Sequence, residues 1–312
     1  MDDVLAWVWG QQSAWSQGAG TLRVTLFRTR KVVLWLTVSA AILAMLGIQI
    51  AVVSAVSGRA FAATAAVAVG LVTFAQRGSS RKQVQNWTRA RSVSEGLKGE
   101  VFRFLAGVVP YRDADRAEVL KRNIDKILDD AKDLARCTIG VTPEQRPLPA
   151  VSNIDTYIAE RIRQQIDTYY RPQSMAMKRL ADRYRTAVNV LAIIAMLLGL
   201  GAAFTGWQQF AGWAPVVTTV IAAVAAHDAA NRYDALALEY ARTDQQLERL
   251  LLERPTGTGA DRQAADDKFV AEAEAVISIQ NESWMARSVA AVAGAEANAA
   301  PERPPDQPSP DA

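Results

Sequence analysis

The stretch Thr186–Ala226, TAVNVLAIIAMLLGLGAAFTGWQQFAGWAPVVTTVIAAVAA, decides the fold because its 41 residues include no Asp, Glu, Lys or Arg. As one helix it would be about 60 Å long, twice the hydrocarbon core of a bilayer, which is about 30 Å thick. The polar segment GWQQ at 206–209 divides the run near its middle. The stretch therefore predicts a membrane hairpin, two apolar helices joined by a turn.

A second pair of apolar runs lies earlier in the chain. Residues 32–58 carry no charge, Arg59 interrupts, and residues 60–76 form a shorter, Ala-rich run. Small residues let two membrane helices approach closely, so we expect the shorter run to insert as the partner of the helix before it. The sequence thus predicts an all-α membrane protein with four spans in two hairpins, at 32–76 and 186–226, and a cytoplasmic helical bundle.

Basic residues at the outer ends of both hairpins set the predicted orientation. They are Arg23, Arg28, Arg30 and Lys31, then Arg77, Arg81 and Lys82, and before the second hairpin Lys178, Arg179, Arg183 and Arg185. Such residues stay on the cytoplasmic side and attract anionic lipid headgroups, so we expect a multi-pass protein with both termini in the cytoplasm. Nucleic-acid binding is not expected, because it needs a basic face on a folded domain. The single cysteine, Cys137, excludes an internal disulfide and fits a reducing cytoplasm.

Helical seams fill the chain outside the hairpins. Apolar residues recur at steps of three and four, as in helices that pack along one another. The seam of the first module (77–137) is Val84, Trp87, Ala90, Ser94, Leu97, Val101, Phe104 and Val108, and that of the second (227–290) is Tyr233, Leu236, Tyr240, Thr243, Leu247 and Leu250. A Pro-rich linker at 138–153 separates the modules, and the Ala- and Pro-rich tail at 291–312 is expected to be disordered. Because hairpin and helix recur in the same order, we predict an internal repeat.

Two further segments precede the hairpins. Residues 154–185 predict an amphipathic lead-in helix. Its apolar stripe is Ile154, Ile158, Ile162 and Ile166, and Glu160, Arg161, Arg163 and Asp167 fall on the other face. Residues 1–31 contain Trp7, Trp9 and Trp15, which allow two interpretations: a segment lying on the membrane interface, or a cytosolic helix.

The sequence shows no catalytic, cofactor-binding or metal-binding constellation, so we expect no enzyme and no cofactor. One histidine and one cysteine far apart provide no zinc spacing, and no phosphate-binding glycine motif is present. His227, next to Asp228 at the end of the fourth span, is interpreted as a solvated boundary residue, with a pH-sensitive role as the alternative. The spans contain no charged residue, which argues against an ion-coupled transporter.

A few polar side chains remain inside the spans. The candidates are Gln49, Asn189, Thr218 and Thr219. Hydrogen bonding between helices is the favoured interpretation, and lining of a pore assembled from several chains is the alternative.

The second module resembles the SLATT family, bacterial two-transmembrane effector domains that associate with SMODS and SLOG proteins. The resemblance covers residues 154–286. It rests on the pattern Y-I-x-E-R-I-x-x-Q-x-x-x-Y-Y ahead of the hairpin and on a late N-E-x-W, where Gln280 replaces an expected acid. The matching residues are Tyr157, Glu160, Arg161, Gln165, Tyr169, Tyr170, Asn281, Glu282 and Trp284. The first module is similar in layout, which suggests two tandem modules.

This resemblance implies a non-enzymatic effector in the bacterial inner membrane. It would oligomerise into a pore gated by its cytoplasmic helices, and a cytosolic sensor or nucleotide-signalling partner would trigger it. The alternative is a membrane-anchored scaffold or sensor that recruits a cytosolic partner without conducting.

Overall fold

The computed structural model describes residues 2–205, 211–254 and 261–278, and these residues are helical apart from short connections and the 138–153 segment. Four of the helices are long and apolar enough to cross a membrane. The first module contains α1 (Asp2–Ala51), α2 (Ala55–Gln76), α3 (Arg81–Ala106) and α4 (Arg116–Asp129). The second contains α5 (Ile154–Tyr157), α6 (Arg171–Thr205), α8 (Trp213–Asn231), α9 (Tyr233–Leu252) and a helix over 261–278. The expected all-α architecture is confirmed.

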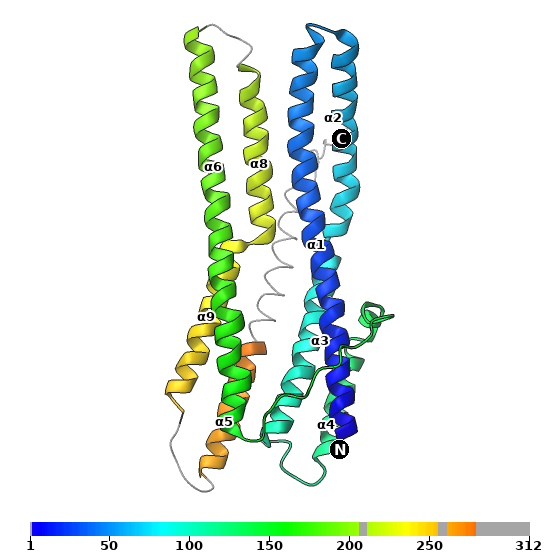
Figure 1. Cartoon of the computed structure of the whole chain (residues 1–312), viewed down its shortest axis with the longest axis vertical. Helices are drawn as coiled ribbons and strands as arrows, with labels where there is room; N and C mark the ends of the chain where they lie inside the picture. The colour runs from blue at the N-terminus through cyan, green and yellow to red at the C-terminus, as the bar shows by residue number, and fades with distance from the viewer. Residues whose placement is uncertain (1, 206–210, 255–260, 279–312) are drawn as a thin grey trace, which may run out of the picture.

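The first hairpin is formed by the upper half of α1 and by α2, which run antiparallel (Figure 1). Ser54 caps α2 by accepting a hydrogen bond from the Ser57 amide at 3.4 Å. Gly58 lies against the end of α1, where an added Cβ would stand 2.7 Å from Cα of Ala51. The absent side chain therefore sets how closely the two helices approach.

The second hairpin is formed by α6 and α8. It lies beside the first, and the axes of its helices are roughly parallel to those of the first hairpin (Figure 1). The chain is helical without a break from Ile154 through Thr205, so the lead-in segment and the third span form one continuous helix. The predicted turn at 206–209 lies outside the described residues. The hairpins meet at the ends away from their turns, where Arg30 Nη1 donates to Asn231 Oδ1 at 3.3 Å.

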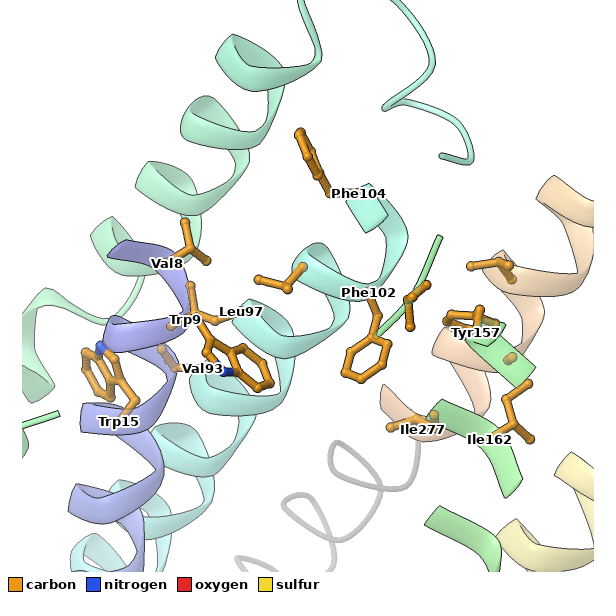
Figure 2. Packing of buried hydrophobic residues seen from close by; sticks show 14 of the residues in the cluster. Val8, Trp9, Trp15, Val93, Leu97, Phe102, Phe104, Tyr157, Ile162 and Ile277 are labelled. Carbon is orange, nitrogen blue, oxygen red and sulfur yellow. The ribbon is translucent and has the colours of Figure 1, made fainter. Parts of the chain in front are cut away.

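The portions of both modules outside the hairpins share one hydrophobic core. Figure 2 shows Trp9 of α1, Phe102 of α3 and Tyr157 of α5 within this core. The rings pack edge to face, with centroids 6.5 Å apart for Trp9 and Phe102 and 6.3 Å apart for Phe102 and Tyr157. Such geometry aligns the positive ring edge with the negative ring face. Because α3 of the first module packs against helices of its own module and of the second, the helices outside the hairpins pack as a single unit.

The predicted seams are confirmed by burial. All eight seam positions of the first module are buried, seven of them in α3 and Val108 just beyond it, as are the four Ile residues of the lead-in stripe. In α9, Leu250 is half-buried and the other five seam positions are buried. The 138–153 segment lies against α1, because Trp9 Nε1 donates to the Pro147 carbonyl at 3.1 Å.

The interfacial interpretation of residues 1–31 is wrong. Trp9 and Trp15 are buried in the shared core, and of the three tryptophans only Trp7 is exposed. The helix also continues through position 31 without interruption, so the N-terminal segment and the first span both belong to α1. The tryptophans pack against protein because α3 and the 138–153 segment cover them.

Replacing Gly58 with Ala should destabilise the first hairpin, because the new Cβ would overlap Ala51. Overpacking of this kind costs about 1–3 kcal/mol. Gly70→Ala on the same helix is the matched control, since its Cβ would meet no described atom within 4 Å. Unfolding in detergent micelles measures both variants, and equal losses would contradict close packing at Gly58.

Candidate functional site

The candidate site lies where the lead-in helix faces α3, α9 and the 261–278 helix. Two π-helical segments, Ile158–Arg163 and Ile166–Tyr170, continue α5 toward α6. Four residues of an α-helix turn about 400°, so a stripe at four-residue steps drifts about 40° per step. The wider π turns take up this drift. Two stripes at four-residue steps thus keep facing the core: the Ile stripe and, beside it, Tyr157, Arg161, Gln165 and Tyr169.

Arg161 is the centre of this arrangement and is fully buried, with 0% of its surface exposed. Its Nε and Nη2 donate to the two carboxylate oxygens of Glu274, at 2.9 and 2.8 Å. Tyr157 donates its hydroxyl to the same carboxylate at 2.9 Å. The Arg161 guanidinium also lies 5.0 Å from the centre of the Phe102 ring. The prediction that Arg161 sits on the polar outer face is wrong, because a partner distant in sequence draws it inward.

Glu274 remains ionised in this environment. Burial alone would raise its pKa, but the Arg161 charge and the hydrogen bonds from Arg161 and Tyr157 lower the pKa below its usual value. The carboxylate and guanidinium are thus both charged and enclosed by protein. A bidentate pair of this kind fixes geometry as well as charge, so it sets the position of the 261–278 helix against the lead-in helix.

A second cluster lies one step further toward the membrane. The rings of Tyr169, Tyr170 and Tyr240 pack together, with centroids 5.3 Å apart for Tyr169 and Tyr170 and 5.7 Å apart for Tyr169 and Tyr240. Arg91 of α3 donates to the Tyr169 hydroxyl and lies 5.6 Å from its ring centre. This contact joins the first module to α6 and α9.

A polar cavity of about 340 Å³ opens between the two clusters. It is lined by Arg91, Glu95, Lys98, Gln164, Gln165, Thr168, Tyr169 and Tyr170. The Gln165 amide, with its oxygen toward the cations, accepts hydrogen bonds from Lys98 at 3.3 Å and Arg161 at 3.0 Å. Glu95 lies 3.7 Å from the Arg161 guanidinium. The cavity wall is therefore built from both modules and carries several charges.

The structure brings together five of the predicted motif residues, namely Tyr157, Arg161, Gln165, Tyr169 and Tyr170. Glu160 is half-buried and has no hydrogen bond or ion pair within the described residues of the chain. Asn281, Glu282 and Trp284 lie outside the described residues.

His227 is buried, with 6% of its surface exposed, so its interpretation as a solvated residue is wrong. Its ring lies 5.3 Å from that of Tyr184, and Tyr184 stacks on Tyr233. The Asn231 side chain donates to the His227 carbonyl at 2.7 Å. The aromatic side chains of α6 and α9 thus enclose it at the end of the hairpin. Its pH-sensitive role stays a prediction.

The polar residues of the spans lie apart from this site. Thr218 and Thr219 are exposed, and their hydroxyls donate to the carbonyls of Ala214 and Pro215 in their own helix. For these two residues, the prediction of hydrogen bonds to another helix of the same chain is therefore wrong. Asn189 is exposed on α6, and Gln49 is half-buried on α1.

Sequence reasoning missed Glu274, and it did not assign Arg91, Glu95 and Lys98 to a site. One feature of the sequence could have identified Glu274. It lies four residues after Val270 and three before Ile277, which are both buried, so it falls on the core-facing side of its helix. A carboxylate at a core position needs a buried cation as its partner. Arg161 offers the matching signal, because it lies on a four-residue stripe with Tyr157 and Gln165. No group of three or more His, Cys, Asp or Glu side chains in the described ranges could hold a metal.

Glu274→Gln should destabilise the folded chain, because it leaves Arg161 buried without its counter-ion. Removing one partner of a buried ion pair costs about 3–5 kcal/mol. The double variant Arg161→Met/Glu274→Leu removes both charges and should recover much of this loss. Chemical unfolding in detergent measures the free energies. The control is Asp133→Asn, which removes an exposed pair with Arg89 and should change little; an equal effect of both single variants would contradict the assignment.

Two family models match the chain. Residues 157–284 match SMODS and SLOG-associating 2TM effector domain 1, and residues 11–118 match a protein of unknown function (DUF4231). The first match begins at Tyr157 of the buried cluster and includes the second hairpin; the second includes the first hairpin and α3. Neither is an enzyme family. No curated protein and no solved structure matches the chain.

The first match and the apolar helices together indicate a membrane protein. The match of the first module to a separate family model is consistent with two tandem modules. The second module, over residues 157–284, is therefore similar to the SMODS and SLOG-associating two-transmembrane effector (SLATT) domains.

Proposed function

We propose that this protein is a non-enzymatic effector of the bacterial inner membrane, in which several copies assemble a pore gated by their cytoplasmic cores. Both termini of each chain would lie in the cytoplasm. The family match supports the effector class. Assembly and gating are argued below from the surface of the hairpins and from their connection to the buried site.

The exposed apolar side chains of α6 are the main support for this proposal. None of the most apolar 18-residue stretch in its span is buried. The exposed apolar side chains are Val190, Ile193, Ile194, Met196, Leu197, Leu200 and Phe204. Asn189, Thr218 and Thr219 of the same hairpin are also exposed. Polar side chains in membranes favour contacts with other helices, so this surface fits a neighbouring copy of the chain.

The connection between cytoplasm and membrane supports gating. The helix that begins at Ile154 holds Arg161 and Tyr169 in the buried clusters and then enters the membrane as α6 without a break. A change in the packing of Arg161 and Glu274 would therefore shift the span directly, because no flexible joint separates them.

A scaffold that recruits a cytosolic partner is the second candidate. Leu238 and Leu252 of α9 are exposed, Leu252 by 87% of its surface. They are 14 residues apart, close to four helical turns, and so lie on a similar face. Exposed apolar residues on one face are typical of protein-binding surfaces.

Purified full-length protein in dye-loaded vesicles with anionic lipid should release dye. The rate should rise more steeply than the protein-to-lipid ratio, because several copies form one pore. Glu274→Gln should release dye faster, since it loosens the core that holds the pore closed. Glu253→Gln, which removes an exposed carboxylate paired with Arg249, is the matched control and should behave as wild type. Absence of release from both the wild type and Glu274→Gln would rule out the pore and leave the scaffold.

The orientation is tested with single cysteines in a Cys137→Ala background. Val53→Cys lies in the turn between α1 and α2, where Val53 is 90% exposed, and Lys121→Cys lies on the exposed face of α4. An impermeant maleimide added to intact spheroplasts should label the first and spare the second until the membrane is permeabilised. Labelling in the reverse order would overturn the proposed topology.

A further inference from the structure

We propose that the polar cavity between α3 and the lead-in helix binds a small phosphate-bearing anion from the cytoplasm, with the phosphate against Arg91 and Lys98. This proposal goes beyond the proposed function and does not depend on it, because binding can occur whether or not the protein conducts.

The charges around the cavity leave an excess of positive charge. Three cations, Arg91, Lys98 and Arg161, face two carboxylates, Glu95 and Glu274. Arg161 holds Glu274 through two hydrogen bonds. Glu95, which lines the cavity, lies 3.7 Å from the same guanidinium and also attracts Arg91 and Lys98, so one carboxylate is shared among three cations. Arg91 and Lys98 are the cations left to face the cavity.

The surroundings of the Lys98 amine are the strongest argument that this cavity binds an anion. Within the described residues no carboxylate lies within 4.0 Å of its amine, and its hydrogen-bond partner is the neutral Gln165 amide. Burial, followed by repulsion from Arg161, lowers its pKa. Placing a half-buried ammonium beside another buried cation is unfavourable, and a bound anion would offset that cost.

Arg91 is the second cation of the proposed site. Its N–H groups hydrogen-bond to the hydroxyls of Tyr169 and Tyr240, and a guanidinium has five N–H donors, so others remain for a ligand. An arginine and a lysine together suit a phosphate group, because one offers a planar fork and the other a compact charge. Gln164, Gln165 and Thr168 add neutral polar groups along the wall.

Size and position identify the source of the anion. A volume of about 340 Å³ falls at the lower end of the range of about 300–1,000 Å³ for small-molecule pockets. Tyr170 precedes the start of the apolar run at Thr186 by 16 residues, or about 24 Å along the helix. The headgroup layer of one leaflet is only about 5–7 Å thick. A lipid headgroup therefore does not reach the cavity, and a soluble phosphate compound does.

The test uses the full-length protein in maltoside micelles, which contain no phosphate. Inorganic phosphate is titrated against chloride at equal ionic strength, and binding is followed by thermal unfolding and by broadening of the phosphate ³¹P resonance. Wild type should gain thermal stability with phosphate beyond the chloride effect. Lys98→Gln should bind phosphate about tenfold more weakly, as expected for the loss of one charge-assisted hydrogen bond, whereas Lys98→Arg should retain binding.

Lys121→Gln is the matched control, because Lys121 is an exposed lysine on α4 away from the cavity, and it should bind phosphate as wild type does. Without phosphate, Lys98→Gln should be at least as stable as wild type, since it removes repulsion from Arg161. The proposal fails if phosphate acts no differently from chloride on the wild type, or if Lys98→Gln and Lys121→Gln respond alike. It also fails if binding appears only after anionic lipid is added.

Discussion

A carboxylate and a guanidinium that are both buried away from water, Glu274 and Arg161, constrain the whole core that the two modules share. Each charge alone would cost several kcal/mol to bury, and together they are tolerated only in the geometry that satisfies both. Their two hydrogen bonds require the 261–278 helix and the lead-in helix to keep one register. Phe102 of α3 stacks on the same guanidinium, so the first module is held by the pair as well.

The same pair shapes the electrostatics around it. Arg161 satisfies Glu274 and attracts Glu95, and among the charged side chains that line the cavity the cations Arg91 and Lys98 outnumber the Glu95 carboxylate. The polar cavity is thus a by-product of how the central pair is neutralised. The aromatic cluster of Tyr169, Tyr170 and Tyr240 closes its membrane side with apolar rings and hydroxyl groups.

Local periodicity was enough to predict the spans, the seams of α3 and α9 and the Ile stripe, because each depends on residues within a few turns of one another. The buried site was not predictable in this way. Arg161 and Glu274 are 113 positions apart, and no local pattern shows that they pair. His227 and the first tryptophans were misjudged for the same reason, since their covering side chains come from distant helices. The motif residues around Tyr157 were found through family resemblance, but their inward direction comes from the π-helical turns.

The uninterrupted course of α1 has a mechanical consequence. Its 50 residues span about 75 Å, with Trp9 clamped in the core near one end and Gly47 packed on α2 near the other. A rigid rod of that length amplifies rotation: a tilt of about 5° at the end held in the core displaces the far end by about 6 Å, roughly the pitch of one helical turn. A side-chain rearrangement of ångström size around Phe102 would thus displace the far end of α1 by enough to separate neighbouring helices.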